Sequence, residues 1–309
     1  MSGVPWRKRA RRTLRVGFIR AGLWFGALLP FRVAWTIGGL VGRVAWLVGR
    51  RDRELALAHL ASALPGLPEA ERRAIARGSF LHYGHGAAEV AQIARIDGDL
   101  ERYVTYVGDG EEILRVAHAA GKGLIFVTGH LGSWELLARR IVRSGIPSVV
   151  IAARSWHRTI DDLAEDFRAR GDVPTLFRED AGSGRALLKA MRAGKALGIL
   201  IDQDTKVQSV FVPFFGHLAS TPRAAADLAL RFGCPVVVGW SRRRGPNPGD
   251  GYVLEVQRVA YDPSPADSEA EAVRITATCT ARLEQAIRRA PSEWVWMHRR
   301  WKSRTMKSL

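Results

Sequence analysis

From residue 122 onward, short runs rich in β-branched residues alternate with helical stretches, and this alternation constrains the fold more than any other feature. Strands are predicted at 124–128, 148–152, 196–201, 210–214 and 235–240, and helices at about 134–144, 158–170, 182–193 and 222–232. Strands that alternate with helices favour a parallel sheet covered by helices. We therefore predict an α/β fold with a mostly parallel sheet flanked by helices.

Turn and cap residues predict several boundaries. In "STPRAAADLALRFGCP", Thr221 is the expected N-cap, Pro222 the first helical residue and Gly233 the stop. The "PNPGDG" turn at 246–251 precedes an expected antiparallel edge strand at 252–259. Upstream of the alternating region, residues 54–94 indicate two helices separated by a turn at 65–68.

The charge is concentrated at the two ends of the chain. Residues 1–53 hold twelve Lys or Arg and one acid, residues 288–309 hold seven and one, and residues 54–287 are formally neutral. Such ends suit nucleic acid, an anionic membrane surface or an acidic protein. No zinc, helix-turn-helix or RNA-binding signature accompanies the charge, so we expect no nucleic-acid partner. The two cysteines, Cys234 and Cys279, imply no disulfide framework.

The N-terminal segment is apolar and bears tryptophans, but arginines interrupt it. Its longest uncharged stretches, 21–31 and 33–42, are well short of the ~20 residues that a spanning helix needs. Trp24, Trp35 and Trp46, with flanking arginines, are typical of a helical hairpin that lies in the membrane interface. We predict that residues 1–50 form an amphipathic helical membrane anchor and that 51–309 form the catalytic domain. A pair of core helices is the alternative.

The stretch "FVTGHLGSWELLARR", residues 126–140, carries the main functional signal. A buried strand runs into a Gly-His turn, Ser133 is a plausible N-cap, and Glu135 falls in the first helical turn. A carboxylate hydrogen-bonded to one ring nitrogen of His130 would make the other nitrogen a general base. The structural alternative is that Glu135 only favours a helix N-terminus and His130 is an ordinary loop residue.

The block "LIDQD", residues 200–204, ends a second buried strand at the same expected sheet edge as His130. A metal site made of His130, Glu135, Asp202 and Asp204 is possible by residue type, although no recognised ligand spacing supports it. Aspartates that cap a helix are the structural alternative. We expect no metal and no cofactor.

Several blocks, in order, resemble one family. His-Leu-Gly-Ser-Trp-Glu is similar to the HX4(D/E) motif of the lysophospholipid acyltransferase superfamily. Together with "LIDQD", "FVPFFG" at 211–216 and "PSEWVWMHRRWK" at 291–302, it makes the chain resemble lipid A biosynthesis lauroyl and myristoyl acyltransferases. The resemblance spans nearly the full chain.

The resemblance implies transfer of an acyl chain from an acyl-ACP or acyl-CoA thioester to a hydroxyl of a glycolipid acceptor, most simply a lipid A precursor, at the cytoplasmic face of the inner membrane. His130 would be the base and Glu135 would orient it. Asp202, Gln203 and Asp204 would bind substrate or position the site, and Arg154 could bind phosphate or support the oxyanion. "FVPFFG" is expected mainly to pack, and His298 is not expected to be catalytic.

Two alternatives stay open at this point. Related enzymes acylate other lipids, including mannosylated phosphatidylinositol. A non-enzymatic membrane-binding protein on a degenerate transferase scaffold is the other, although the intact His130 and Glu135 count against it.

Overall fold

In the computed structural model of the chain, residues 6–155 and 157–303 are described, and they form the predicted α/β fold. The main sheet has the strand order β1-β9-β8-β2-β5-β3-β4, and every neighbouring pair is parallel except β8 with β9. A separate antiparallel pair consists of β6 and β7. The strands are β1 Val104–Tyr106, β2 Leu124–Thr128, β3 Ser148–Ala152, β4 Thr175–Phe177, β5 Ala196–Leu200, β6 Ser209–Phe214, β7 His217–Pro222, β8 Val236–Arg243 and β9 Tyr252–Val259.

Helices cover both faces of this sheet. Alternation along β2 sends Leu124 and Phe126 to the face that packs against α7 and α8, and Ile125 and Val127 to the face that packs against α10, α11 and α12. The helices are α1 Trp6–Leu28, α2 Phe31–Val48, α3 Arg50–Ala63, α4 Glu69–Ala91, α5 Ile93–Asp97, α6 Leu100–Tyr103, α7 Gly110–Ala119, α8 Trp134–Arg143, α9 Arg158–Ala169, α10 Ser183–Arg192, α11 Ala224–Phe232, α12 Ser268–Arg289 and a 3-10 turn, η1, Pro291–Glu293.

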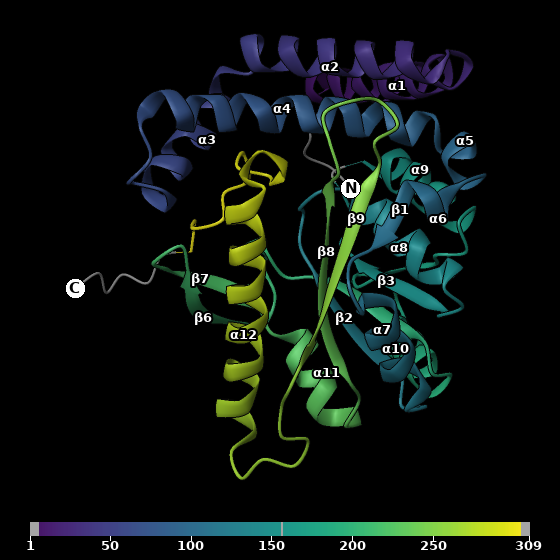
Figure 1. Cartoon of the computed structure of the whole chain (residues 1–309), viewed down its shortest axis with the longest axis vertical. Helices are drawn as coiled ribbons and strands as arrows, with labels where there is room; N and C mark the ends of the chain where they lie inside the picture. The colour runs from purple at the N-terminus through teal and green to yellow at the C-terminus, as the bar shows by residue number, and fades with distance from the viewer. Residues whose placement is uncertain (1–5, 156, 304–309) are drawn as a thin grey trace.

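A third layer crosses the carboxyl ends of the parallel strands. Figure 1 shows α4 lying across the top of the sheet, with α1 and α2 stacked above it. The α2–α4 crossing is close because glycines line it: a Cβ on Gly38 would lie 2.4 Å from the Gly84 carbonyl oxygen, and one on Gly42 would lie 2.5 Å from that of Phe80. The two backbones are therefore almost in contact, and α2 is fixed to α4 and through it to the rest of the fold.

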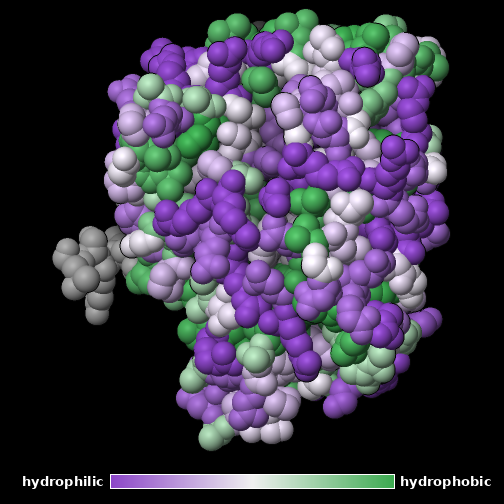
Figure 2. Space-filling view, in the orientation of Figure 1, coloured by the Kyte–Doolittle hydropathy of each residue, from purple (hydrophilic) through white to green (hydrophobic). Residues whose placement is uncertain are grey.

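The outer side of this layer carries many exposed apolar side chains. Figure 2 shows apolar residues, with hydrophilic ones between them, along the upper edge, where α1 and α2 lie. The large exposed hydrophobic side chains of α1 and α2 are Leu14, Phe18, Ile19, Trp24, Phe25, Leu28, Val33, Ile37, Leu40, Val41, Val44, Leu47 and Val48. By length and composition alone, α2 is the single helix among the described residues that is long and apolar enough to cross a membrane.

Two of the three tryptophans that the sequence analysis assigned to the membrane interface differ from that prediction. Trp35 and Trp46 are buried against α4, at 5% and 8% exposure, whereas Trp24 is 68% exposed. Trp35 stacks on His85 with ring centroids 4.2 Å apart, and Trp46 packs edge-on against Phe80. Both rings lie on the glycine-lined face of α2 and pack inside the protein, so the prediction that these two tryptophans contact the membrane interface is wrong.

Three boundary predictions also need correction. Thr221 is not an N-cap and Pro222 is not helical, because residues 217–222 pair with β6 as β7. Residues 210–214 belong to that hairpin rather than to the main sheet. The strand at 252–259 is antiparallel as predicted, but β1 pairs outside it, so it is not the edge. Gly233 does end α11, in the left-handed conformation.

The close contact of α2 and α4 at their glycines predicts that alanine substitutions at two glycines will differ in their effect on stability. Gly84→Ala should separate α2 from α4, since its Cβ would lie 2.2 Å from the Gly38 carbonyl oxygen, and it should cost about 1–3 kcal/mol of stability. Gly22→Ala on α1 is the matched control, because no atom lies within 4 Å of its Cβ and alanine favours helix. Thermal unfolding of both variants checks this; an equal midpoint for the two would contradict it.

Candidate active site

The predicted catalytic turn follows β2 and enters α8. Ser133 caps α8, its hydroxyl accepting from the Leu136 amide at 3.4 Å. Gly132 adopts a left-handed conformation, with φ of +63°, and a Cβ there would lie 2.1 Å from the Ser241 carbonyl oxygen. Only glycine fits this position, so the chain can turn sharply between the strand and the helix.

Within this turn, His130 is held by Asp202. The ring Nδ1 lies 2.8 Å from Asp202 Oδ1, and the His130 backbone amide donates to Oδ2 at 2.6 Å. Gly129 permits this approach, since a Cβ there would meet the carboxylate at 2.9 Å. A carboxylate only accepts, so Nδ1 carries the proton and Nε2 is left as the basic nitrogen.

The electrostatics favour an ionised Asp202. Its side chain is 1% exposed, against 22% for His130. Burial by itself would raise the pKa of Asp202, but the nearby charge of His130 and the hydrogen bonds from His130 and Trp294 outweigh it and keep the pKa below its usual value. The indole Nε1 of Trp294 donates to Oδ2 at 2.8 Å. A buried, ionised carboxylate therefore fixes the tautomer of the imidazole.

The predicted contact between Glu135 and His130 is not formed. Among the described residues, the Glu135 carboxylate accepts from Arg168, with Nη2–Oε1 at 2.6 Å and Nε–Oε2 at 2.9 Å, and from the indole of Trp134. Arg168 comes from α9, 33 residues downstream. This guanidinium satisfies the carboxylate, so Asp202 takes the orienting position that the sequence assigned to Glu135.

A cavity of about 490 Å³ opens beside these groups. Its apolar wall includes Phe126, Val150 and Gly198, which lie in one row across β2, β5 and β3. Leu137 and Ile141 of α8 face the same space. The polar part of the lining includes His130, Glu135, Arg168, Arg178, Gln203 and Thr205. From Ala196 to Leu200 the cavity follows about 13 Å of strand, a shape that suits a hydrocarbon chain.

The other predicted site residues are distributed unevenly. Gln203 lines the cavity, whereas Asp204 is buried outside the lining and accepts from the backbone amide and hydroxyl of Ser303. Arg154 is not brought to this cavity: it pairs with Asp180 and stacks on Phe177 at 3.7 Å. The residues of the metal alternative therefore do not converge, since Glu135 and Asp204 point to different partners.

Four residues that contact the His130 turn or its polar groups were not predicted from the sequence. Arg168 carried no local signal, and His82 and Tyr83 sit within an ordinary helical pattern. His82 Nε2 lies 3.0 Å from the Gly132 carbonyl oxygen, and the Tyr83 hydroxyl donates to that of His130 at 3.1 Å. Trp294 belongs to the C-terminal block that the family resemblance singled out, but the pattern gave no role to its indole.

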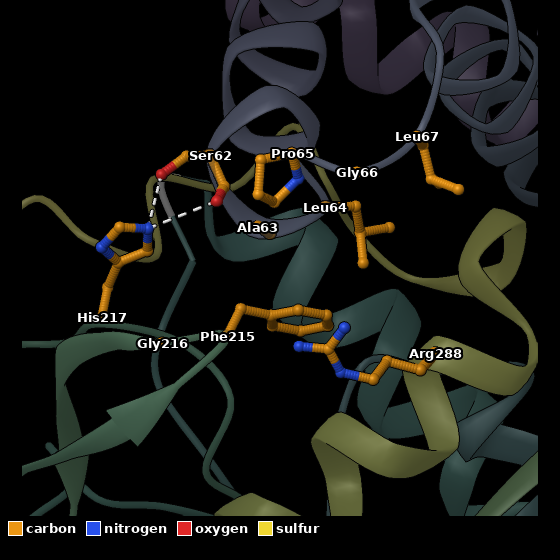
Figure 3. Close-up of a pocket in the computed structure, with 10 residues that line it drawn as sticks. All are labelled: Ser62, Ala63, Leu64, Pro65, Gly66, Leu67, Phe215, Gly216, His217 and Arg288. Atoms are coloured by element: carbon orange, nitrogen blue, oxygen red, sulfur yellow. Dashed lines mark hydrogen bonds between the residues drawn. The ribbon is translucent and has the colours of Figure 1, made fainter.

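A second cavity, of about 560 Å³, lacks comparable chemistry. Figure 3 shows it between the α3–α4 turn and the β6–β7 turn, with Pro65 and Phe215 facing each other and Arg288 against the Phe215 ring. Its histidine, His217, lies 2.8 Å from the hydroxyl of Ser62. Among the described residues no carboxylate bonds to His217, so this pair lacks the orienting group that His130 has.

Comparison with known proteins identifies the family. The family described as bacterial lipid A biosynthesis acyltransferase matches residues 4–303. The lipid A biosynthesis lauroyltransferase of Escherichia coli is 26% identical over 91% of this chain and 89% of its own length. A lipid A biosynthesis acyltransferase of Haemophilus influenzae is 24% identical over 93% and 90%.

A phosphatidylinositol mannoside acyltransferase of Mycobacterium tuberculosis is 24% identical over 71% of this chain and 67% of its own length. The family match spans almost all of the chain, and it includes the turn, the paired His130 and Asp202 and the apolar cavity. The protein is an acyltransferase that belongs to the bacterial lipid A biosynthesis acyltransferase family.

Proposed function

We propose that this acyltransferase moves a fatty acyl chain from an acyl-ACP or acyl-CoA thioester to a hydroxyl of a lipid A precursor. The observation that carries the proposal is the His130–Asp202 pair at the polar side of an elongated apolar cavity. The imidazole supplies a base, and the cavity supplies room for a hydrocarbon chain.

In this mechanism Nε2 of His130 takes the proton of the acceptor hydroxyl as its oxygen attacks the thioester carbonyl carbon. The C–S bond then breaks, and the thiolate takes a proton, which the imidazolium supplies. Asp202 stabilises the imidazolium through its bond to Nδ1. No covalent enzyme intermediate is needed, because both substrates meet at the same base.

Arg168 is the cation that we assign to the carbonyl oxygen. It lines the cavity, and its bonds to Glu135 and Thr175 leave two of its five N–H groups free among the described residues. Glu135 holds the guanidinium in place, so the HX4E glutamate acts through Arg168. Donors fixed before the reaction stabilise developing negative charge without reorganisation.

The relatives support a lipid A precursor as the acceptor. The lauroyltransferase and the acyltransferases of lipid A biosynthesis align over more of the chain than the phosphatidylinositol mannoside acyltransferases do. A phosphorylated disaccharide lipid also suits the cationic ends of the sequence.

The function is tested by transfer of a labelled acyl chain from acyl-ACP or acyl-CoA to a lipid A precursor, with a phosphatidylinositol mannoside as the rival acceptor. His130→Ala should abolish transfer, and Asp202→Asn should lower kcat by about 10²- to 10⁴-fold, since it removes the charge behind the base. Mass spectrometry of the products identifies the acylated lipid.

Thermal unfolding of both variants serves as the folding control. Wild-type turnover in a folded His130→Ala protein would refute the mechanism. Transfer to phosphatidylinositol mannoside alone would refute the lipid A assignment but leave the base in place.

A second prediction concerns the cavity. Gly198 has no side chain at the centre of β5, and a Cβ there would lie 3.3 Å from Val150 Cγ1. A larger residue should therefore fill the space we assign to the acyl chain. Gly198→Val should shift donor preference to shorter chains, measured as kcat/KM across a series of acyl thioesters. An unchanged chain-length profile in a folded variant would place the chain elsewhere.

We further propose that residues 1–50 lie in the plane of the inner membrane at its cytoplasmic face. The packing of α2 along α4 supports this orientation, because α4 carries Glu69, Glu71, Arg72, Arg73 and Arg77 in its first nine residues. If α2 crossed the bilayer, these charges would enter it beside α2, and each buried charge costs at least ~2.5 kcal/mol. The exposed apolar side of α1 and α2 would instead enter one leaflet.

This orientation predicts charge-dependent binding. Replacing Arg20, Arg32 and Arg43 with Glu should weaken binding to anionic vesicles, because each surface-proximal cation contributes about 1 kcal/mol. Arg185→Glu on α10 is a control that should have little effect. Vesicle flotation with and without anionic lipid measures the difference, and an N-terminal tag reached from the far side of the membrane would refute the topology.

A further inference from the structure

The turn that carries His130 is held from the α4 side by a histidine. His82 is 6% exposed, and its Nε2 lies 3.0 Å from the Gly132 carbonyl oxygen. Since a carbonyl only accepts, Nε2 carries the proton and Nδ1 is free to accept. Arg243 Nε donates to that Nδ1 at 3.2 Å. Burial, and then the charge of Arg243, lower the pKa of His82 to about 3, so the ring stays neutral.

Arg243 is itself fixed on several sides. It ends β8, and its Nη1 and Nη2 bond to the two oxygens of Glu89 at 2.8 and 2.9 Å. The ring of Tyr252 lies 4.7 Å from the guanidinium carbon, and that of Trp35 of α2 lies 4.6 Å from it. The hydroxyls of Tyr103 and Tyr252 also donate to Glu89. The guanidinium is therefore held by hydrogen bonds and ring contacts from several sides.

A gain in folding stability does not explain the buried pair of Arg243 and Glu89. The side chains of Arg243 and Glu89 are 11% and 2% exposed, and burying an ion pair costs about as much as the pair returns. The pair instead fixes the orientation of the Arg243 Nε–H group toward His82. This hydrogen bond in turn fixes the orientation of the His82 ring toward the Gly132 carbonyl oxygen.

The turn needs such support because its backbone is not part of a regular element. The Gly132 amide donates to the Glu293 carbonyl oxygen at 3.2 Å, and the Ser133 amide to the Ser241 hydroxyl at 2.8 Å. The bond from His82 fixes the remaining carbonyl of the left-handed residue. A change in the plane of that peptide would move the chain two residues after the base.

We propose that His82 and Arg243 are positioning residues of the transfer reaction, which hold the Gly132 peptide so that the His130 imidazole faces the acceptor hydroxyl. Neither side chain touches the reacting atoms. The inference rests on the proposed function only for the activity readout, because the position of the turn is measurable without substrate.

The experiment uses the full chain in detergent. His82→Phe removes both hydrogen bonds, and His82→Gln restores a donor and an acceptor on one side chain. His82→Phe should lower kcat about 10-fold or more, with the donor KM within about twofold of wild type, because misplacing a catalytic group by ~1 Å costs up to 10²-fold. Hydrogen exchange of the amides at 130–134 should accelerate, and His82→Gln should recover much of both losses.

A matched control and a second variant keep the test decisive. Arg243→Lys keeps the charge but loses the Nε donor to His82, so it should show the slower kcat and faster exchange expected of His82→Phe. It therefore provides the test if the His82→Phe protein does not fold. Arg140→Lys is the control: Arg140 is also buried, lies 4.6 Å from the Tyr106 ring and pairs with Glu111, but it does not contact the turn.

Faster exchange at 130–134 in Arg243→Lys and not in Arg140→Lys supports the proposal. Wild-type exchange and kcat in folded Arg243→Lys overturn it. Failure of the proposed function itself would give a different result: no transfer by the wild-type protein, or full transfer by His130→Ala. Neither of these results would change the hydrogen-exchange comparison.

Discussion

The carboxylate of Asp202 accepts hydrogen bonds from the ring and the backbone amide of His130 and from the indole of Trp294. These donors come from the turn after β2 and from the C-terminal block, so one buried group joins three distant parts of the chain. The carboxylate remains charged because the donors outweigh the cost of its burial. Removing any one of them would leave the others around an incompletely paired charge.

Local chemistry explains what the sequence could predict. The β2 strand, the Gly-His turn and the Ser133 cap involve residues close together in the chain, and their patterns indicate the turn into α8. The choice between Glu135 and Asp202 as the partner of His130 is not local. It depends on β5 lying beside β2 and on Arg168 reaching back from α9 to occupy Glu135. The hydrophobic periodicity of a sequence reveals neither the order of the strands in a sheet nor a contact between residues 33 positions apart.

In the N-terminal segment, too, the sequence pattern predicts the helices but not their tertiary contacts. Its arginine-interrupted apolar pattern indicates two amphipathic helices, and α1 and α2 form there. The pattern does not tell which side of α2 meets protein. Glycines 38, 39 and 42 decide this, because only their side of the helix allows the α4 backbone to approach. Trp35 and Trp46 share that side and are therefore buried, although tryptophans near arginines are typical of a membrane interface.

The position of α4 relates the proposed membrane face to the chemistry. One side of this helix packs against α2, and the other presents His82 and Tyr83 to the turn that carries His130. With α2 in the interface plane, the proposed base, His130, would lie about one helix diameter, ~10 Å, beneath the apolar layer. A hydroxyl on a headgroup or near the start of an attached chain would lie at that depth, whereas the lipid tails would stay in the leaflet. Trp35 contacts both α4 and Arg243, so the seating of α2 and the position of the turn share one set of contacts.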